Sequence, residues 1–294
     1  MNDTIRHESV DCGGVTLHCA VAGESGRPLM LFLHGFPEFW AAWRVAMRHF
    51  AARGWLAVAP DLRGYNLSDK PQGVEAYKAK HLMADVLALG AHYAKGKFVL
   101  IAHDWGGAVA WGVAIAQSHR LERLVAINSP HPYLFWRELV NNPAQQKASE
   151  YMNLFRLPKA ERVLSENGYA RLLGAFGHLE AAWCAELVQA WSRPGALTGG
   201  LNYYRASPLH PATADDPGAK KLELKPADFM VRVPTLVLWG ERDTALLTGC
   251  IEGLGQCVPD LKLVRVPDAS HWIVHEKPEL VCGEIERFAA AKSI

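Results

Sequence analysis

Asp104 stands where a buried strand is expected to turn sharply into a helix. It lies in the segment Ala102-His-Asp-Trp-Gly106, which follows the apolar run 98–102 and opens the amphipathic stretch 106–117. Small residues two positions before and after a central residue fit the tight turn called a nucleophile elbow, in which serine is the usual central residue. The turn forces positive φ, which Asp tolerates better than most residues, and the helix N-terminus favours an anion. An Asp here could also be only a helix N-cap, so partners elsewhere in the chain decide.

Two further residues complete a possible reaction centre in the chain order of this kind of site, which is nucleophile, acid, histidine. Asp243 follows the apolar run 235–239, and His271 follows the next run, 261–266. If both runs are strands of one parallel sheet, both residues lie at the same sheet edge as Asp104. A carboxylate nucleophile needs a base to release its covalent intermediate, and a group that orients that base. We therefore expect His271 to be the base and Asp243 to orient it.

Each of these partners has a rival close by in the sequence. Glu241 or Asp268 could replace Asp243, and His275 could replace His271, although His275 is expected in or beside the last helix. The histidines of two motif loops are expected to hold backbone rather than react: His34 and His103. No clustering of His, Asp and Glu predicts a metal site, and the chemistry described next requires no cofactor.

The choice of Asp instead of Ser at position 104 narrows the chemistry. A serine that displaced a group from a saturated carbon would leave an ether, which water does not easily cleave. A carboxylate leaves an ester instead, and a histidine with water can hydrolyse that ester. Asp104 therefore favours the opening of an epoxide or the expulsion of halide from an alkyl halide.

The elements that must position these residues alternate along the chain. Short apolar runs predict buried strands covered on both faces: 15–21, 29–33, 56–59, 98–102, 124–127, 235–239 and 261–266. Longer amphipathic stretches predict helices: 42–52, 80–93, 106–117 and 278–290. This alternation indicates an α/β fold with an open, mostly parallel central sheet flanked by helices.

The alternation breaks between about Pro130 and Pro211, where the sequence is typical of helices throughout. We expect a helical cap domain over residues 130–212, inserted between the two parts of a core domain, 1–129 and 213–294. The cap would lie over the carboxyl ends of the strands, where open α/β sheets bind ligands.

The composition is that of a globular protein and argues against nucleic-acid and membrane partners. Half of the 294 residues are hydrophobic, and a formal net charge of +1 gives no general attraction to nucleic acid or to an anionic membrane. No apolar run approaches the roughly 18 residues of a spanning helix, and the first ten residues lack the apolar stretch of a signal peptide. The six cysteines form no C-x-x-C pair and are expected to be reduced thiols. We expect a cytoplasmic enzyme with no membrane or nucleic-acid partner, of undetermined oligomeric state.

Motifs along nearly the whole chain resemble the α/β-hydrolase-fold epoxide hydrolases. They are His34-Gly-Phe-Pro-Glu38, Asp61-Leu-Arg-Gly-Tyr65 with Ser68-Asp-Lys-Pro71, His103-Asp-Trp-Gly-Gly107, Asn202-Tyr-Tyr-Arg205 and His271-Trp272. The resemblance implies the α/β-hydrolase fold, an oxyanion hole made by the backbone N–H groups of Phe36 and Trp105, and a cis Phe36–Pro37 bond. Asn66 stands where the family usually has glycine, a departure that is tolerated because Asn accepts left-handed conformations.

Two tyrosines match the residues that open the ring in epoxide hydrolases. Tyr151 begins the pattern Tyr-x-x-x-Phe-x-x-Pro, and Tyr204 lies in Asn202-Tyr-Tyr-Arg205. An epoxide leaves as an alkoxide and needs a proton donor, which a tyrosine of pKa about 10 can supply, whereas a halide needs only N–H donors. Either tyrosine could instead pack on an apolar helical face, and Tyr203 is expected to be structural.

The leading hypothesis is hydrolysis of a small apolar epoxide by water to a vicinal diol. The alternative is dehalogenation of a haloalkane or haloacid by the same Asp-His-Asp set. Haloalkane dehalogenases typically have Asn where Phe36 stands, and fluoroacetate dehalogenases usually have Arg where Trp105 stands, so neither pattern fits as well. A third hypothesis, a ligand-binding protein without activity, is weakened because every reacting group is present.

Overall fold

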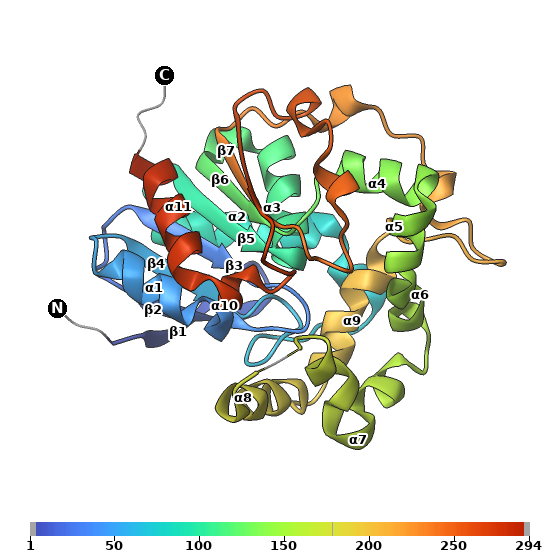
Figure 1. Cartoon of the computed structure of the whole chain (residues 1–294). Helices are drawn as coiled ribbons and strands as arrows, with labels where there is room; N and C mark the ends of the chain where they lie inside the picture. Colours follow the sequence, from blue (N-terminus) through green and yellow to red (C-terminus); the bar gives the residue numbers. More distant parts are fainter. Residues whose placement is uncertain (1–3, 178, 291–294) are drawn as a thin grey trace.

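A twisted central sheet organises the computed structural model, which describes residues 4–177 and 179–290 (Figure 1). Within that part of the chain the strand order is β1-β2-β4-β3-β5-β6-β7-β8. The strands are β1 (Arg6–Asp11), β2 (Thr16–Ala22), β3 (Leu29–Leu33), β4 (Leu56–Pro60), β5 (Phe98–His103), β6 (Leu121–Ile127), β7 (Thr235–Gly240) and β8 (Leu261–Val266). The pairs β1–β2 and β2–β4 are antiparallel and the other neighbours are parallel, which confirms the predicted mostly parallel sheet.

Strand β1 is the one strand that the apolar runs do not predict among the described residues. Its sequence, RHESVD, is largely polar, and Val10 is its one buried residue. The strand lies at the edge of the sheet, where charged side chains protect an unpaired backbone from pairing with other chains. The first strand therefore lacks the apolar pattern because it is an edge strand.

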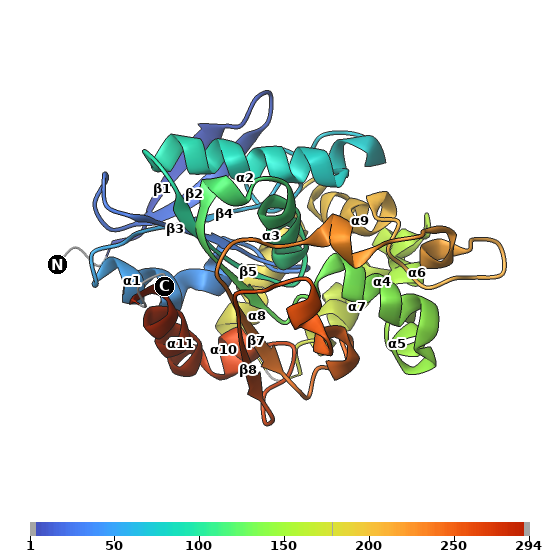
Figure 2. The same cartoon turned by 90° about the horizontal axis from the view of Figure 1, so that it is seen from above.

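Helices cover both faces of the sheet (Figure 2). Helices α1 (Arg44–Ala51), α10 (Ile273–Glu276) and α11 (Pro278–Ala290) lie on one face, and α2 (Ala79–Tyr93) and α3 (Asp104–Ala116) lie on the other. Successive strand residues pack into opposite layers, so that Ile101 belongs to the core beside α1 and α11, while Leu100 and Ala102 belong to the core beside α2 and α3. Because both faces are buried, the strands need no polar alternation.

Between β6 and β7, the described residues form six α-helices, which lie together beyond the carboxyl ends of the parallel strands (Figure 1). They are α4 (Pro132–Asn141), α5 (Pro143–Ala148), α6 (Glu150–Arg156), α7 (Ala160–Gly174), α8 (Ala181–Trp191) and α9 (Ala196–Ala206). Helix α7 is broken at Gly168, where three successive residues have positive φ. Short 3₁₀ turns complete the structure: Trp40–Trp43, Val74–Tyr77, Ser118–Arg120, Gly218–Lys221, Pro226–Phe229, Thr248–Ile251 and Leu254–Gln256.

The cysteines are free thiols, and all except Cys184 are buried. Buried thiols pack like small apolar side chains, so they contribute to the core without cross-linking it. Over residues 4–177 and 179–290, none of the helices combines the length and the apolar character needed to cross a membrane.

A buried ion pair fixes the loop after β4 against α2. Arg63 donates to both carboxylate oxygens of Asp85, with N···O distances of 2.7 and 2.6 Å, and the two side chains are only 8% and 3% exposed. The backbone carbonyl of Arg63 accepts a hydrogen bond from the Tyr203 hydroxyl at 2.9 Å. The pair thereby holds the loop on which α9 rests.

Asp85→Ala should destabilise the protein strongly because it leaves the Arg63 guanidinium buried without a counter-charge. Losing one partner of a buried pair costs about 3–5 kcal/mol, so the free energy of unfolding from urea denaturation should fall by that order. As the matched control, Glu75→Ala breaks an exposed pair with Lys78 and should leave stability nearly unchanged. Similar losses in the two variants would contradict a structural role for the buried pair.

Candidate active site

Close packing around Asp104 explains the small residues of the turn between β5 and α3. Asp104 has a φ of 50°, in the left-handed region. A Cβ on Gly106 would lie 2.5 Å from the backbone oxygen of Leu33, and one on Gly35 would lie 2.4 Å from the Cβ of Asp104. Both distances are too short for any larger residue, so the two glycines let β3 and its loop approach the turn.

The Asp104 carboxylate has one oxygen held by backbone and one facing an imidazole. Its Oδ1 accepts a hydrogen bond from the Phe36 N–H at 2.7 Å. Its Oδ2 lies 3.6 Å from Nε2 of His271, and the side chain is 13% exposed. Ser129 donates to the Asp104 carbonyl at 2.8 Å, which fixes the turn from the other side. The carboxylate is therefore anchored but accessible.

His271 lies between two carboxylates. Its Nδ1 is 2.6 Å from Oδ2 of Asp243, opposite the nitrogen that faces Asp104. Burial disfavours the imidazolium, but Asp243, Asp104 and Glu38 together outweigh burial and raise the pKa of His271 to about 9. Burial alone would raise the pKa of Asp243, whereas the charge and hydrogen bond of His271 lower it. The structure thus brings together the three residues that the chain order predicts, with His271 between Asp243 and Asp104.

Asn128 holds Asp243 in place and is absent from the sequence motifs. Its amide Nδ2 donates to Oδ2 of Asp243 at 2.8 Å and to the Gly240 carbonyl at 3.1 Å, and its Oδ1 accepts from the Gly240 N–H at 2.8 Å. The other oxygen of Asp243 accepts from the N–H groups of Ala245 and Leu246, at 2.8 and 2.9 Å. Asn128 directly follows β6 with a φ of 38°, and a polar residue just after a predicted strand is the signal that could have identified it.

A second buried polar cluster, made of Glu38, His103 and His275, lies behind His271. Glu38 is 1% exposed and hydrogen-bonds His275, and its other oxygen is 3.5 Å from Nδ1 of His103. His103 Nε2 in turn donates to the backbone carbonyl of His271 at 2.9 Å. Burial would raise the pKa of Glu38, but His275 and His103 outweigh it and lower that pKa. A charged Glu38 therefore supports the loop that carries His271.

The rival residues point elsewhere. Glu241 pairs with Arg265, and Asp268 pairs with Lys277 at 2.6 Å on the exposed surface. His275 faces Glu38. Among residues 4–177 and 179–290, no group of three or more His, Cys, Asp or Glu side chains is arranged to hold a metal ion.

Tyr151 of α6 and Tyr204 of α9 meet in an aromatic cluster at the carboxyl edge of the sheet. Their ring centroids are 6.2 Å apart, edge to face. Tyr204 also packs edge-on against Trp105 at 4.9 Å and against Phe36 at 5.3 Å. Burial raises the pKa of both hydroxyls, and the charge of Asp104 raises each further. Both tyrosines therefore stay protonated at neutral pH, within electrostatic reach of Asp104.

Tyr203 has the structural role that the sequence predicts for it. It is 1% exposed, and its ring packs against Tyr65 and Tyr77. Its hydroxyl is occupied by the bond to the Arg63 carbonyl.

Phe36 and Trp105 place backbone N–H groups beside Asp104. The Phe36 N–H already donates to the carboxylate, and Trp105 lies in the first turn of α3, where N–H groups have no partner within the helix. The Phe36–Pro37 bond is cis, as the resemblance implies, and Asn66 has a φ of 37°. Asn66 thus adopts the left-handed conformation that a glycine would tolerate at this position.

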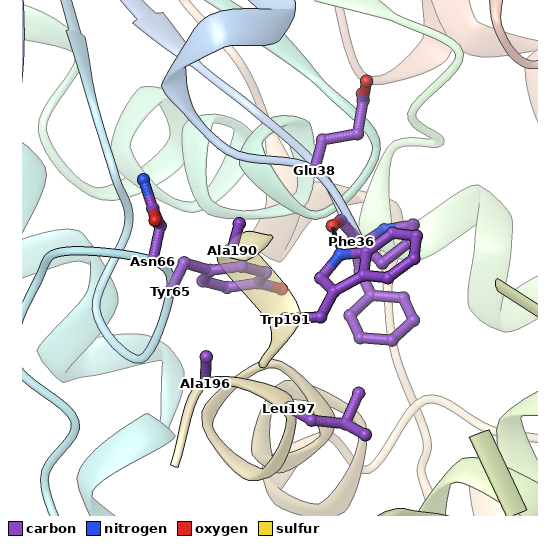
Figure 3. Close-up of a pocket in the computed structure, with 9 residues that line it drawn as sticks. Phe36, Glu38, Tyr65, Asn66, Ala190, Trp191, Ala196 and Leu197 are labelled. Carbon is purple, nitrogen blue, oxygen red and sulfur yellow. Dashed lines mark hydrogen bonds between the residues drawn. The ribbon is translucent and has the colours of Figure 1, made fainter. Parts of the chain in front are cut away.

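Two hollows adjoin these residues. The smaller, of about 10 Å³, lies beneath Phe36, Tyr65 and Trp191, and the side chains of Glu38 and Asn66 point away from it (Figure 3); it has room for about one water. The larger, of about 540 Å³, is open and is lined in part by His271. The larger hollow therefore reaches the loop that carries His271, while Asp104, Tyr151 and Tyr204 are not among the residues that line it.

Comparison with known proteins extends over almost the whole chain. A family model described as alpha/beta hydrolase fold matches residues 28–278. The chain is 38% identical to the AB hydrolase superfamily protein YfhM of Bacillus subtilis (strain 168), over 95% of this chain and 96% of that protein. It is 36% identical to epoxide hydrolase 4 of Mus musculus, over 94% of this chain and 76% of that protein.

A solved structure from a study of novel epoxide hydrolases in metagenomes from hot environments is also similar. It matches with a TM-score of 0.88 and 37% identity, over 98% of this chain and 100% of that chain. The fold, the order of the site residues and these matches agree. The chain is therefore a hydrolase that belongs to the epoxide hydrolase family of the α/β-hydrolase fold.

Proposed function

We propose that this protein hydrolyses an epoxide to a vicinal diol through a covalent ester on Asp104. The observation that carries the proposal is the position of Asp104. One of its carboxylate oxygens lies 3.6 Å from Nε2 of His271, and its charge raises the pKa of both Tyr151 and Tyr204. These observations support a nucleophile, a base and two proton donors in one site. The similarity to epoxide hydrolases supports epoxide hydrolysis, and the contacts of Asp104 and His271 support their roles as nucleophile and base.

In the first step, a carboxylate oxygen of Asp104 attacks an epoxide carbon and the carbon–oxygen bond of the ring breaks. Tyr151 and Tyr204 donate hydrogen bonds to the departing oxygen, and one of them transfers its proton to it. The charge of Asp104 contributes to the high pKa of both hydroxyls. Because esterification removes that charge, a tyrosine ionises more easily at the stage when the alkoxide needs its proton.

In the second step, His271 takes a proton from a water molecule, which attacks the ester carbonyl of Asp104. The N–H groups of Phe36 and Trp105 stabilise the negative charge that develops on the carbonyl oxygen. The ester bond to the diol oxygen breaks, and that oxygen leaves with the proton that His271 took from water. The carboxylic acid of Asp104 gives its proton to the tyrosinate, and one oxygen of water stays in the carboxylate. His271, with a pKa of about 9, is an imidazolium in the free enzyme at neutral pH. Loss of the Asp104 charge lowers that pKa, so once the ester exists the imidazolium releases its proton to solvent and the neutral imidazole can act as the base. His271 takes up a proton from solvent again when the Asp104 carboxylate re-forms.

We further propose that residues 130–212 form a cap domain on a core of residues 1–129 and 213–294. The proposal is supported by the way in which the site residues are divided between the two parts. Helices α6 and α9 carry the two tyrosines, while Asp104, Asp243 and His271 follow the ends of β5, β7 and β8. Ring opening would then require both parts, and ester hydrolysis mainly the core. The substrate would be a small apolar epoxide, and a cytoplasmic location remains a prediction from composition.

Dehalogenation by the same residues has less support. A departing halide needs N–H donors, and the Phe36 side chain supplies none, whereas paired hydroxyls suit an alkoxide. A panel of styrene oxide, an aliphatic epoxide and a bromoalkane distinguishes the reactions. Diol from either epoxide is expected, and halide release without epoxide turnover would reverse the assignment.

The covalent step predicts the path of oxygen in water enriched in ¹⁸O. With enzyme in excess over styrene oxide, the first diol formed should carry unlabelled oxygen from Asp104, while label appears in the peptide containing Asp104. Mass spectrometry of the diol and of the digested protein measures both. Label in the first-turnover diol, with none in the peptide, would mean that water attacks the epoxide directly.

Removing either hydroxyl should slow ring opening specifically. Because a positioned acid contributes about 10²–10⁴-fold, Tyr151→Phe and Tyr204→Phe should each slow ester formation by at least about 10²-fold in rapid-quench experiments. Tyr203→Phe is the matched control, since its hydroxyl bonds the Arg63 carbonyl, and it should leave ester formation nearly unchanged. Unaltered ester formation in both test variants would remove the tyrosines from the mechanism.

The charge of Asp243 should control the protonation of His271. In the wild type, the imidazole should titrate near pH 9, above its ordinary value, because the carboxylate stabilises the imidazolium. Asp243→Asn removes that charge and should lower the pKa, while Glu241→Gln, which alters the pair with Arg265, should not. Titration followed by NMR of the imidazole nitrogens measures all three proteins, and a wild-type value at or below 6.5 would contradict the electrostatics of the site.

A further inference from the structure

Gln145 belongs to none of the sequence motifs, yet its side chain lies at a junction of the site. It is in α5, the short helix between α4 and α6 (Figure 1), and it is fully buried. A primary amide offers two N–H donors and an acceptor oxygen, and buried polar groups of this kind need partners. Its contacts therefore indicate what the residue holds together.

On one side, the amide of Gln145 holds the start of the helix that carries Tyr151. Its Nε2 donates to the hydroxyl of Ser149 at 2.8 Å. Ser149 is itself fully buried and directly precedes α6. Tyr151 is the second residue of α6, so Ser149, which Gln145 holds, is two positions before Tyr151 in the chain.

On the other side, the same amide holds the segment after β7. Its Nε2 also donates to the Ala245 carbonyl at 2.7 Å, and its Oε1 accepts from the Leu247 N–H at 2.8 Å and from the Cys250 thiol at 3.4 Å. The N–H of Ala245 is one of the donors that hold Asp243. The segment fixed by Gln145 is therefore the one that presents Asp243 to His271.

We propose that Gln145 is a positioning residue that sets the place of Tyr151 relative to Asp104 and Asp243. One planar amide joins the two segments, and its bonding capacity is used on both of them. This inference rests on the function proposed above, in which Tyr151 donates to the epoxide oxygen. Gln145 touches no reacting group, so its effect on the reaction must pass through the residues that it holds.

A positioning role makes a prediction that a purely structural role does not. If Gln145 acts through Tyr151, its substitution should matter only while the tyrosine hydroxyl is present. Residues that act as one unit show strong coupling in a double-mutant cycle, whereas independent effects add. The comparison of one substitution in two backgrounds therefore separates the two roles.

The experiment measures ester formation by full-length protein with styrene oxide, using rapid quench and mass spectrometry of the Asp104 peptide. Gln145→Met keeps the length of the side chain and removes its hydrogen bonds, so ester formation should slow by about 10-fold to 100-fold. In the Tyr151→Phe background, the same substitution should cost less than about 3-fold. The matched control is Gln146→Met, because the side chain of Gln146 donates to the Val140 carbonyl of α4, at 3.1 Å, and it should behave like the wild type.

Ser149→Ala gives a second arm that is independent of how well Gln145→Met folds. It removes only the bond toward α6, so it should slow ester formation less than Gln145→Met does, and its effect should also vanish with Tyr151→Phe. Equal losses in both backgrounds would make Gln145 structural only. If Tyr151→Phe alone left ester formation unchanged, the proposed role of Tyr151 would be wrong, and the role of Gln145 would fall with it.

Discussion

The negative charge on Asp104 is the property on which the rest of the site depends. It raises the pKa of His271, Tyr151 and Tyr204, in each case in addition to the effects of burial or of other partners. In the resting state, these three groups therefore hold their protons. Formation of an ester would remove the charge, and the three pKa values would fall together. In the proposed mechanism, one bond-forming event would thus prepare both the proton donor for the alkoxide and the base for the water.

The fold holds this charge by backbone geometry as well as by the imidazole of His271, which lies 3.6 Å from the carboxylate. Asp104 occupies a left-handed turn at the start of α3, with the Phe36 N–H on one oxygen and the helix N-terminus beneath it. The loops from β3, β5, β7 and β8 meet there because the carboxyl ends of parallel strands share one edge of the sheet. Buried support such as the Arg63–Asp85 pair lies beneath the residues that face the substrate.

Chain-local features of the site could be predicted from the sequence. The turn at Asp104 could be recognised because Ala102 and Gly106 lie within two positions of it in the chain, although the close packing that requires glycine at position 106 comes from the distant residues Leu33 and His34. Asp243 and His271 could be placed at the carboxyl edge of the sheet because each follows an apolar run that predicts a buried strand. His34 was expected to hold backbone, and it does, through Gly35 and Leu62.

The parts that could not be predicted depend on contacts between distant segments. Asn128 supports Asp243, a residue 115 positions away, and His275 pairs with Glu38 across 237 positions. Gln145 reaches a segment about a hundred residues later in the chain. The place of Asn128 just after a predicted strand marks it as a candidate, but no local pattern of a polar residue in a loop or a short helix identifies the distant residue that it holds. Strand β1 was not predicted for a different reason: it is an edge strand, and edge strands carry polar residues instead of an apolar run.

The most direct test of the central claim is to trap the ester. Without the imidazole at position 271, ring opening can proceed while hydrolysis stops, so His271→Gln mixed with styrene oxide should gain the mass of one substrate molecule. Digestion should place that mass on the peptide containing Asp104, and Asp104→Asn in the same background should abolish it. An unmodified protein that still turns over epoxide, or an adduct on another peptide, would contradict the claim that Asp104 bonds to the substrate.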